Sequence, residues 1–462
     1  MYKIGISAWT GMTVRNILFG ATLTELKGKF QVTVISYYGD QLKTALPLEA
    51  QESLKFEKLQ NPRWNLPSLR GRLQPILDQW GRYALWSRER LPILWLYFLR
   101  KEWESAPTRA IVNRFSASLA VKRRENVARN FLRDLAYSVP IRKQFGELDA
   151  FFVASINTPK DRQIIYSCKK YKIPVVALVH SWDNLVSKGW LPASPDRLLV
   201  WNKFMAREAE LLHNIPAQNI AVVGGPQYEL YRKIARGVER SEFLDRFNLS
   251  PESNIITYTG CAEWLYPDEE HLIRHLLNKI KRGEFGDSTL IFRLHPTEVR
   301  SARYLEKFQD PSLPIRVVQP DSMFAAQNTW SVGSPDSIQA FVELMVFSDL
   351  IINMSSTIVL DAICFDTPVI CTKFNFDHDQ NAWNAAHNNF LTDHYKPIVQ
   401  SDAVYFPQSS KELDSAIKEV LENPAKRSKA RRALAEKVIP DLPTSALIRE
   451  NIAEVCAGIR RS

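Results

Sequence analysis

The fold is decided by the stretch Asp349-Leu-Ile-Ile-Asn-Met-Ser-Ser-Thr-Ile-Val-Leu-Asp-Ala-Ile-Cys-Phe-Asp-Thr-Pro-Val-Ile370. An apolar run of strand length, Leu350 to Asn353, stops at three hydroxyl residues, and an apolar segment of helical character follows. A second apolar run, Val369 to Thr372, comes next. This order predicts a strand, a helix and a parallel second strand joined by a right-handed crossover.

The same alternation extends outward from this stretch in both directions. The first predicted strand, Tyr2 to Ser7, is followed by Thr10-Gly11-Met12 and a helical pattern. Apolar or β-branched runs predict the other strands at Gln31–Tyr37, Ala150–Ala154, Val175–Val179, Arg197–Trp201, Ile220–Val223, Asn254–Tyr258, Thr289–Leu294 and Ile315–Gln319. The chain is therefore predicted to be an α/β protein with two doubly wound parallel sheets facing a cleft.

The length of the chain and the alternation of strands and helices predict two domains. A chain of 462 residues is too long for one ordinary core. We expect an N-terminal acceptor domain over 1–235 and a C-terminal nucleotide-donor domain over 250–440. The C-terminal helix over 441–462 is expected to pack back on the N-terminal domain. The rhythm is interrupted at about 60–142, where a helical insert is predicted.

Composition indicates a soluble, cytoplasmic protein. Hydrophobic residues make up 45% and charged residues 24% of the chain, a balance typical of globular proteins. The N-terminus lacks the pattern of a secretory leader. The five cysteines are widely spread, which favours reduced core thiols over disulfides or a zinc site.

The hydroxyl residues that follow the predicted strand at 350–353 form the strongest motif. Ser355, Ser356 and Thr357 stand where a helix begins, and Asp361 lies about one turn further on. Backbone N–H groups and hydroxyls at this point can bind a diphosphate. The alternative is that a serine only caps the helix.

Two further segments of the C-terminal half are candidate donor-binding elements. Arg293 and His295 lie at the carboxyl end of a predicted strand, where an imidazole can donate to a phosphate or a sugar hydroxyl. Gly260 follows another strand and completes the predicted donor set. A structural role for His295 is the competing interpretation.

The N-terminal half carries a histidine motif, His180-Ser-Trp-Asp-Asn-Leu-Val-Ser-Lys-Gly189, after a buried strand. His180 is positioned to act as a base that deprotonates an acceptor hydroxyl. Asp183 is either that base or the group that orients His180. Asn184 and Lys188 are expected to bind the acceptor. A turn whose polar groups only cap the next helix is the alternative.

The loop after the first strand is a further candidate for acceptor binding. Gly11 permits close approach of the backbone to a ligand, and Arg15 suits an anionic group. The chain has no Gly-x-Gly-x-x-Gly fingerprint and no P-loop. An ordinary strand–helix turn would explain the same residues.

With these motifs placed, the chain resembles the GT-B superfamily of glycosyltransferases. Within it, the sequence is similar to the branch of CDP-glycerol glycerophosphotransferases and surface-polysaccharide glycosyltransferases. Leu294-His295-Pro296 and the segment from Ser355-Ser356 to Asp361 resemble that branch's donor-binding segments, and His180 through Lys188-Gly189 resembles its acceptor-base segment. Many members carry a glutamate where this chain has Asp361, one methylene shorter.

The resemblance implies a metal-independent glycosyltransferase without a cofactor, which moves a sugar from a nucleotide-diphosphate donor to an oligosaccharide or lipid-linked acceptor. His180 would take the acceptor proton, while Ser355 to Thr357 and His295 stabilise the leaving diphosphate. The alternatives are a CDP-glycerol-type polyol-phosphate transferase, a sugar-nucleotide 2-epimerase, and a membrane-binding scaffold without activity. No nucleic-acid motif accompanies the net charge of +10.

The basic, tryptophan-rich insert suggests a membrane surface as a partner. Seventeen Lys and Arg face six Asp and Glu between Arg63 and Lys143, together with five tryptophans. The apolar run Leu91 to Leu99 is too short to span a bilayer but suits its interface. We expect peripheral binding to the anionic inner face of the cell membrane. A solvated insert with core tryptophans is the alternative.

Overall fold

The computed structural model describes residues 1–36, 40–46, 48–58, 134, 137–139, 141–261, 265–295, 301–308, 310, 312–321, 333–380 and 385–459. The chain forms two compact units, Met1–Glu229 with Asp441–Ser462, and Leu230–Pro440. The predicted insert over 60–142, apart from a few residues near its end, lies outside the described residues, and so do its five tryptophans and Leu91–Leu99. Among the helices that the structure describes, none is long and apolar enough to span a bilayer.

The N-terminal unit is built on a parallel sheet of seven strands, in the order β3-β2-β1-β4-β5-β6-β7. Its strands are β1 (Tyr2–Ser7), β2 (Phe30–Ser36), β3 (Lys55–Lys58), β4 (Ala150–Val153), β5 (Val175–Leu178), β6 (Arg197–Val200) and β7 (Ile220–Val222). The order reverses between β1 and β4. That reversal places a crevice for ligands beyond the carboxyl ends of these two strands.

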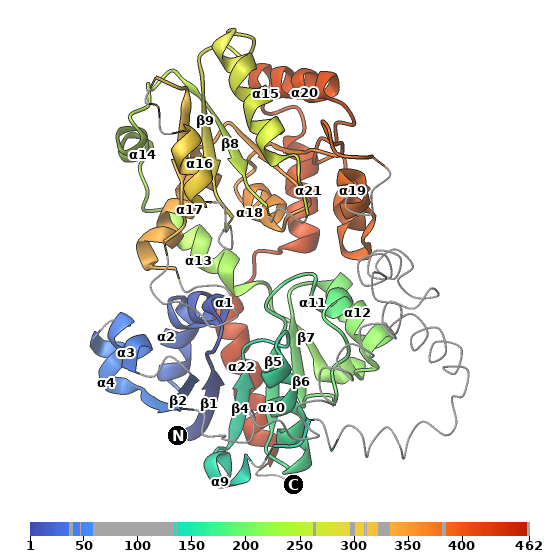
Figure 1. Cartoon of the computed structure of the whole chain (residues 1–462). Helices are drawn as coiled ribbons and strands as arrows, with labels where there is room; N and C mark the ends of the chain where they lie inside the picture. The colour runs from blue at the N-terminus through green and yellow to red at the C-terminus, as the bar shows by residue number, and fades with distance from the viewer. Residues whose placement is uncertain are drawn as a thin grey trace. The chain divides into compact units, whose positions relative to one another are not determined.

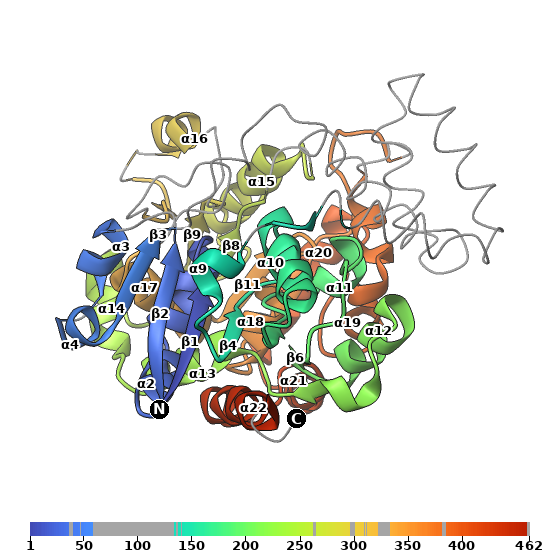
Figure 2. The same cartoon turned by 90° about the horizontal axis from the view of Figure 1, so that it is seen from below.

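Helices cover both faces of this sheet. The helical elements are α1 (Gly11–Thr13), the π-helical η1 (Val14–Leu18), α2 (Ala21–Lys27), α3 (Asp40–Ala45), α4 (Leu48–Ser53), α9 (Arg142–Phe145), α10 (Pro159–Lys170), α11 (Asn184–Ser187), α12 (Lys203–His213), η3 (Ala217–Asn219) and α22 (Thr444–Ile459). Figure 2 shows α2 and α22 on one face and α10 on the other, as right-handed crossovers require.

The C-terminal helix α22 belongs to the N-terminal unit. It packs against α2 and against β4, β5 and β6 (Figure 1). Side chains tie it down: Thr22 Oγ1 lies 3.0 Å from Ser445 Oγ, and the backbone N–H of Ser445 donates to Glu229 at 3.0 Å. The last helix therefore completes one face of the first sheet.

The C-terminal unit contains a parallel sheet of five strands, in the order β10-β9-β8-β11-β12. The strands are β8 (Asn254–Thr259), β9 (Ser288–Arg293), β10 (Ile315–Val318), β11 (Leu350–Asn353) and β12 (Val369–Cys371). Here the order reverses between β8 and β11. The hydroxyl motif thus follows a strand at the switch point of its sheet.

The helices of this unit flank the five strands. They are α14 (Arg240–Phe247), α15 (Glu269–Lys281), α16 (Ser301–Phe308), α17 (Pro335–Phe347), α18 (Ile358–Ile363), η4 (Ala386–Leu391), η5 (Asp393–Tyr395), α19 (Lys396–Val399), α20 (Ser410–Glu422) and α21 (Ser428–Val438), while α13 (Pro226–Ala235) crosses the boundary between the units. The predicted α/β class with two doubly wound parallel sheets is confirmed.

Candidate functional site

The loops at the switch point of the N-terminal sheet are joined by a buried carboxylate. Asp161, in the first turn of α10, has no exposed surface. Its Oδ1 accepts from Trp9 Nε1 at 2.7 Å, and its Oδ2 accepts from the backbone N–H and the hydroxyl of Thr158, each at 2.8 Å. Burial raises the pKa of Asp161, and the bonds from Thr158 and Trp9 oppose that rise. The loops after β1 and β4 are therefore held together.

His180 lies just past β5, at the carboxyl edge of the same sheet. Its side chain is 2% exposed, and Nδ1 has no hydrogen-bond partner among the described residues. Burial lowers the pKa of His180 to about 4; Asp183 opposes this shift, and Lys188 and Arg15 add to it. The imidazole is thus neutral at pH 7 and can accept a proton. Four predicted residues (His180, Asp183, Lys188 and Arg15) act on one another here.

Asp183 is saturated with hydrogen bonds. Its carboxylate accepts from Ser181 Oγ at 2.7 Å, from Ser187 Oγ at 2.6 Å and from Asn184 Nδ2 at 3.1 Å, and Lys188 Nζ lies 3.6 Å away. A carboxylate so engaged is poorly placed to take a proton from a substrate. The geometry favours the positioning role for Asp183 over the role of base.

Asn184 begins α11 and contributes a second buried polar atom to this edge. Its Nδ2 donates to Asp183, whereas its Oδ1 has no partner within the described part of the chain. Buried polar atoms are nearly always hydrogen-bonded, so an unpartnered one needs an explanation, and a ligand is one of them. Asn184 and His180 belong to the same sequence motif, and each has such an atom.

Arg15 and Gly11 belong to the element that follows β1. Arg15 lies in η1, and its Nε donates to Asn16 Oδ1 at 2.8 Å. Asn16 Nδ2 in turn donates to Gln227 Oε1 at 3.4 Å, from the start of α13. Single π-helical turns are frequent at functional sites. Gly11 is the first residue of the short helix α1, which Thr10 caps.

Two residues that sequence reasoning missed hold the His180 loop in place. His213, at the end of α12, has Nε2 2.8 Å from the Leu185 carbonyl and accepts from the Leu191 N–H at 3.3 Å through Nδ1. Arg162 of α10 donates to the Lys188 carbonyl at 2.9 Å. Burial lowers the pKa of His213 to about 4. Both side chains come from distant helices, and no local motif marks them.

The lowered histidine pKa values predict acid sensitivity. The pKa of His180 is about 4 in the folded chain and near 6.5 in the unfolded chain. Below pH 6.5 the unfolded state therefore binds more protons than the folded state. Stability is therefore lost as pH falls from 6.5 to 4, by about 3 kcal/mol from His180 alone. Urea unfolding at pH 7 and 4.5 should show a smaller loss for His180→Gln than for the unchanged chain. Equal losses would contradict the assignment.

In the C-terminal unit, Gly260 lies where the chain leaves β8. Its N–H donates to the Arg293 carbonyl at 2.8 Å. A Cβ at this position would lie 3.0 Å from Glu269 Oε1 and 3.1 Å from Phe292 Cε2, so the loop needs a glycine. The buried Glu269, which the sequence did not mark, accepts from the Cys261 N–H at 2.8 Å and from Tyr258 Oη at 3.0 Å. It fixes this turn.

The hydroxyl motif forms a strained turn after β11. Ser355 has φ of +34°, in the left-handed region that a residue with a Cβ enters at a cost. Its hydroxyl has no bond within the described residues. Ser356 Oγ accepts from the Ile358 N–H at 3.3 Å, and Tyr395 Oη donates to the Ser356 carbonyl at 2.9 Å. Strain of this kind is concentrated at binding and catalytic sites.

The expected cap is only partly present. Thr357 is the N-cap residue of α18, but its side chain makes no capping bond. The helix has six residues, so its dipole is weak and the hydroxyls carry most of the predicted anion binding. Asp361 lies buried in α18. Ser355, Ser356 and Thr357 are all half-buried, at the carboxyl edge of the sheet.

Arg293 and His295 lie at the neighbouring strand end. Arg293 closes β9, and its guanidinium lies 4.8 Å from the ring centroid of Phe341. His295 is half-buried, and Pro296 lies outside the described residues. A cavity of about 470 Å³ opens here, with Arg246, Arg293, Gln319, Asp321, Asp336 and Phe341 among its lining residues. Aromatic and polar groups of this kind suit a nucleoside.

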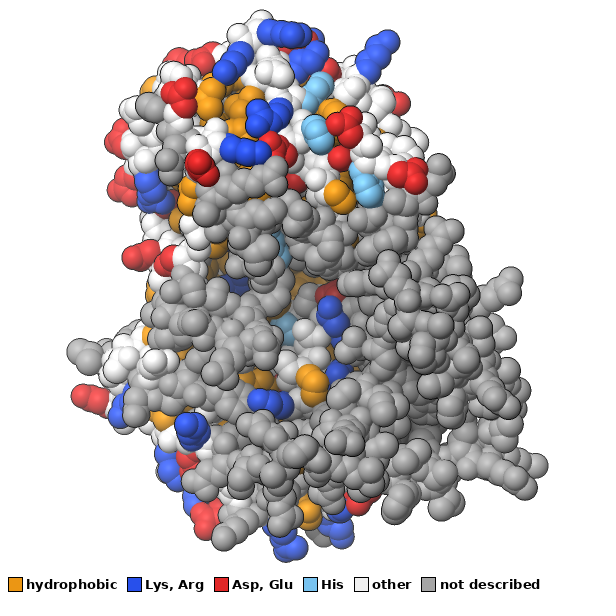
Figure 3. Space-filling view, in the orientation of Figure 1, with side chains coloured by type: hydrophobic (Ala, Val, Ile, Leu, Met, Phe, Trp, Pro, Cys, Tyr) orange, Lys and Arg blue, Asp and Glu red, His pale blue; other side chains and the backbone are white. Residues whose placement is uncertain are grey.

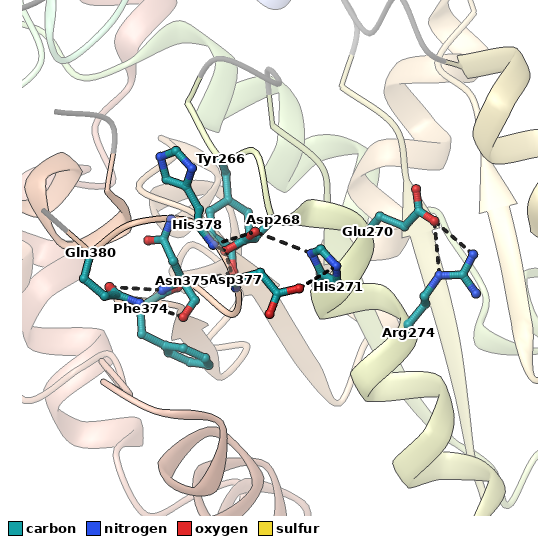
Figure 4. Close-up of polar contacts among 10 residues, drawn as sticks. All are labelled: Tyr266, Asp268, Glu270, His271, Arg274, Phe374, Asn375, Asp377, His378 and Gln380. Atoms are coloured by element: carbon teal, nitrogen blue, oxygen red, sulfur yellow. Dashed lines mark hydrogen bonds and ion pairs between the residues drawn. The ribbon is translucent and has the colours of Figure 1, made fainter. Parts of the chain in front are cut away.

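A third carboxylate joins two loops of this edge (Figure 4). Asp268 accepts from the N–H groups of Asp377 at 3.2 Å and His378 at 3.0 Å, and lies 3.5 Å from His271 Nδ1. Tyr266 Oη donates to the Phe374 carbonyl at 3.3 Å. These hydrogen bonds join the loop after β8 to the loop after β12. Figure 3 shows histidine and acidic side chains gathered on this face.

Comparisons with known proteins find solved structures with a similar fold. No protein-family model and no curated protein matches the sequence. The structure is similar to the UDP-GlcNAc 2-epimerase of Neisseria meningitidis bound to UDP-GlcNAc, with a TM-score of 0.55, 12% identity and coverage of 99% of this chain and 100% of that one. The structure of S. aureus MnaA with UDP gives a TM-score of 0.54, 12% identity and coverage of 98% and 95%.

A glycosyltransferase has the same fold. The Rickettsia africae glycosyltransferase aligns with a TM-score of 0.51 and 12% identity, over 100% of this chain and 99% of that one. The predicted GT-B fold is thereby confirmed. Identities this low establish the fold and leave the activity to be argued from the residues.

Proposed function

We propose that this chain binds a uridine diphosphate sugar and acts on the sugar without a metal ion. The observation that carries the proposal is the state of His180: a buried, neutral imidazole with an unpartnered nitrogen, flanked by the cations Arg15 and Lys188. A neutral base beside positive charges suits proton removal from a substrate whose product is anionic. The N-terminal unit supplies this base.

The C-terminal unit is proposed to bind the donor. Ser355, Ser356 and Thr357 present hydroxyls at the switch point of its sheet, and His295 stands at a neighbouring strand end. These groups would hold the diphosphate. The cavity that Arg293 and Phe341 help to line would take the uridine, since polar and aromatic groups surround it. Gly260 would shape the turn at the end of β8 beside the ligand, and Asp361 stays a candidate for the ribose.

A sugar-nucleotide 2-epimerase is the form of this activity that the structural neighbours favour, because several of them are UDP-GlcNAc 2-epimerases. Such an enzyme must remove the hydrogen on C2 of the sugar as a proton while the C1–O bond to the diphosphate breaks, and then return a proton to the opposite face of C2 while the diphosphate adds back to C1. His180 would move that proton, with Asp183 fixing the loop that carries it. Cationic side chains would stabilise the anionic diphosphate in place of a metal ion.

Glycosyl transfer is the second candidate, supported by the Rickettsia enzyme and by the single base at His180. In this form His180 deprotonates an acceptor hydroxyl, and Gly11, Arg15, Asn184 and Lys188 bind the acceptor. An oligosaccharide or a lipid-linked acceptor at the inner face of the cell membrane would fit the basic insert. The more specific likeness to CDP-glycerol transferases stays an expectation.

One experiment separates the two candidates. Incubation with UDP-GlcNAc in D₂O, with EDTA and without an acceptor, should give the C2 epimer with deuterium at C2 if the chain is an epimerase. A transferase should leave the sugar unchanged until an acceptor is added, and then release UDP. A requirement for a divalent ion in either case would refute the metal-independent mechanism.

The hydroxyl turn gives a test of the donor site. Ser355→Ala with Ser356→Ala should weaken UDP binding by at least about tenfold, as expected for the loss of hydrogen bonds to a charged group. Ser355→Gly removes the hydroxyl and also relieves the positive φ, so it should raise Tm while it weakens binding. Calorimetric titration measures the affinity of each variant for UDP, and thermal unfolding measures its Tm.

The matched control for this test is Ser415→Ala, which removes a hydroxyl on α20 of the same unit. It should leave UDP affinity unchanged. If the serine variants also bind UDP as the unchanged chain does, the assignment of Ser355 and Ser356 to the diphosphate is wrong.

A further inference from the structure

Two buried polar atoms at the carboxyl ends of β8 and β11 lack hydrogen-bond partners among the described residues. Thr259, the last residue of β8, is 1% exposed, and Asn353, the last residue of β11, is fully buried. Thr259 Oγ1 and Asn353 Nδ2 have no hydrogen bond within the described part of the chain. Leaving buried polar groups unpaired destabilises a fold. Thr259 and Asn353 lie on adjacent strands, so we look for one explanation for both unpaired groups.

The register places these two residues next to each other. Ile352 pairs with Tyr258, so Asn353 and Thr259 are the next positions on two parallel strands, with side chains on one face. β8 and β11 are the strands between which the sheet order reverses. The unpartnered atoms therefore lie at the point where a doubly wound sheet receives its ligand.

The same face shows how this fold treats hydroxyls that have only a structural role. Thr257, two residues before Thr259 on β8, has its Oγ1 2.6 Å from Ser348 Oγ. That threonine is as buried as Thr259, yet it is satisfied inside the protein. The contrast marks Thr259 as the exception on its own strand.

The amide of Asn353 is held in one orientation. Its Oδ1 lies 3.5 Å from the Ser356 N–H nitrogen and 3.5 Å from Cys371 Sγ, both of which donate to it. The amide nitrogen must then point away from these two donors. Asn353 thus supports the strained turn at Ser355 with one atom and keeps the other available as a hydrogen-bond donor.

We propose that Thr259 and Asn353 are direct binding residues for the diphosphate, forming the floor of the site beneath Ser355, Ser356 and Thr357. This inference rests on the proposed function. A threonine hydroxyl and an amide NH₂ are neutral donors, and two such donors converging in a buried crevice fit the anionic oxygens of a nucleoside diphosphate. Their unpaired state in the free chain is relieved when the ligand binds.

The test compares UDP affinity with thermal stability. Thr259→Val keeps the shape of the side chain and removes its hydroxyl. Asn353→Asp keeps Oδ1 for Ser356 and Cys371 but replaces the NH₂ donor by an anionic oxygen. We expect UDP to bind at least about fivefold more weakly to Thr259→Val, and more than about tenfold more weakly to Asn353→Asp. The Tm of Thr259→Val should stay the same or rise, because an unpaired group is removed.

Thr257→Val is the matched control, on the same strand and the same face. It should lower Tm, because Ser348 Oγ loses its bond with Thr257 and keeps only the bond that it donates to the Leu344 carbonyl, and leave UDP affinity unchanged. If Thr259→Val behaves in this way instead, with lower Tm and unchanged affinity, Thr259 has a structural partner such as a buried water and the inference is overturned. A failure of UDP to bind the unchanged chain would refute the proposed function itself, which is a separate outcome.

Discussion

Replacing His180 by glutamine should lower turnover by roughly 10²–10⁴-fold, the usual effect of removing a general base. Glutamine fills a similar volume but cannot take a proton near neutral pH. UDP binding should be unchanged, because the groups assigned to UDP, which are Ser355 to Thr357, His295 and the cavity at Arg293, belong to the C-terminal unit. Steady-state kinetics together with calorimetric titration of UDP would measure both quantities.

The pH profile adds a readout that a structural role would not move. Since the pKa of His180 is lowered to about 4, the activity of the unchanged chain should not fall between pH 7 and pH 5. Asp183→Asn is the companion variant: it weakens the network that holds the loop but leaves the base in place, so its loss should be smaller. If His180→Gln reduced turnover and UDP affinity together, His180 would be a donor-binding or structural residue.

Replacing Asp161 by alanine should cost the N-terminal unit roughly 3–5 kcal/mol of unfolding free energy, the range measured when a buried hydrogen-bonded charge network loses a member. The side chain is fully buried and accepts from Trp9 and Thr158. Its loss removes the acceptor of the Trp9 indole N–H and of the half-buried Thr158 backbone N–H. Urea unfolding, followed by hydrogen exchange of peptides from β1 and β4, would locate the effect.

Asp149→Ala is the control for Asp161. Its carboxylate accepts from the Lys3 N–H at 2.7 Å at the exposed, opposite end of the same strands. Water can replace it there, so the cost should be under about 1 kcal/mol. Equal losses in the two variants would show that burial of Asp161 contributes nothing to the stability of this edge.

Strand positions could be predicted from the sequence because these strands are apolar. Eleven of the twelve strands that the structure describes begin and end within one residue of the predicted ranges. The exception is β3, Lys55-Phe-Glu-Lys58, an edge strand whose charges protect it from pairing with other chains but hide it from pattern analysis.

The positions of candidate site residues in the fold could be predicted where these residues follow strands. His180, Arg293, Gly260 and Ser355 all lie at the carboxyl ends of strands, so strand prediction also located them. The residues that hold them were not predictable. His213, Arg162 and Glu269 reach the site from helices, and their contacts depend on side-chain directions that only the folded chain defines. The strain at Ser355 and the unpaired atoms of Thr259 and Asn353 leave no trace in sequence pattern.

We propose that the C-terminal unit binds a uridine diphosphate. Thermal unfolding with and without UDP, UMP, CDP and GDP, each in the presence of EDTA, tests it most directly, since a ligand that binds only the folded state must stabilise it. We predict that UDP at 100 times its Kd stabilises the unit by about 2.7 kcal/mol, that UMP does so less, and that EDTA has no effect. The absence of a Tm shift with every nucleoside diphosphate at millimolar concentration would contradict the claim.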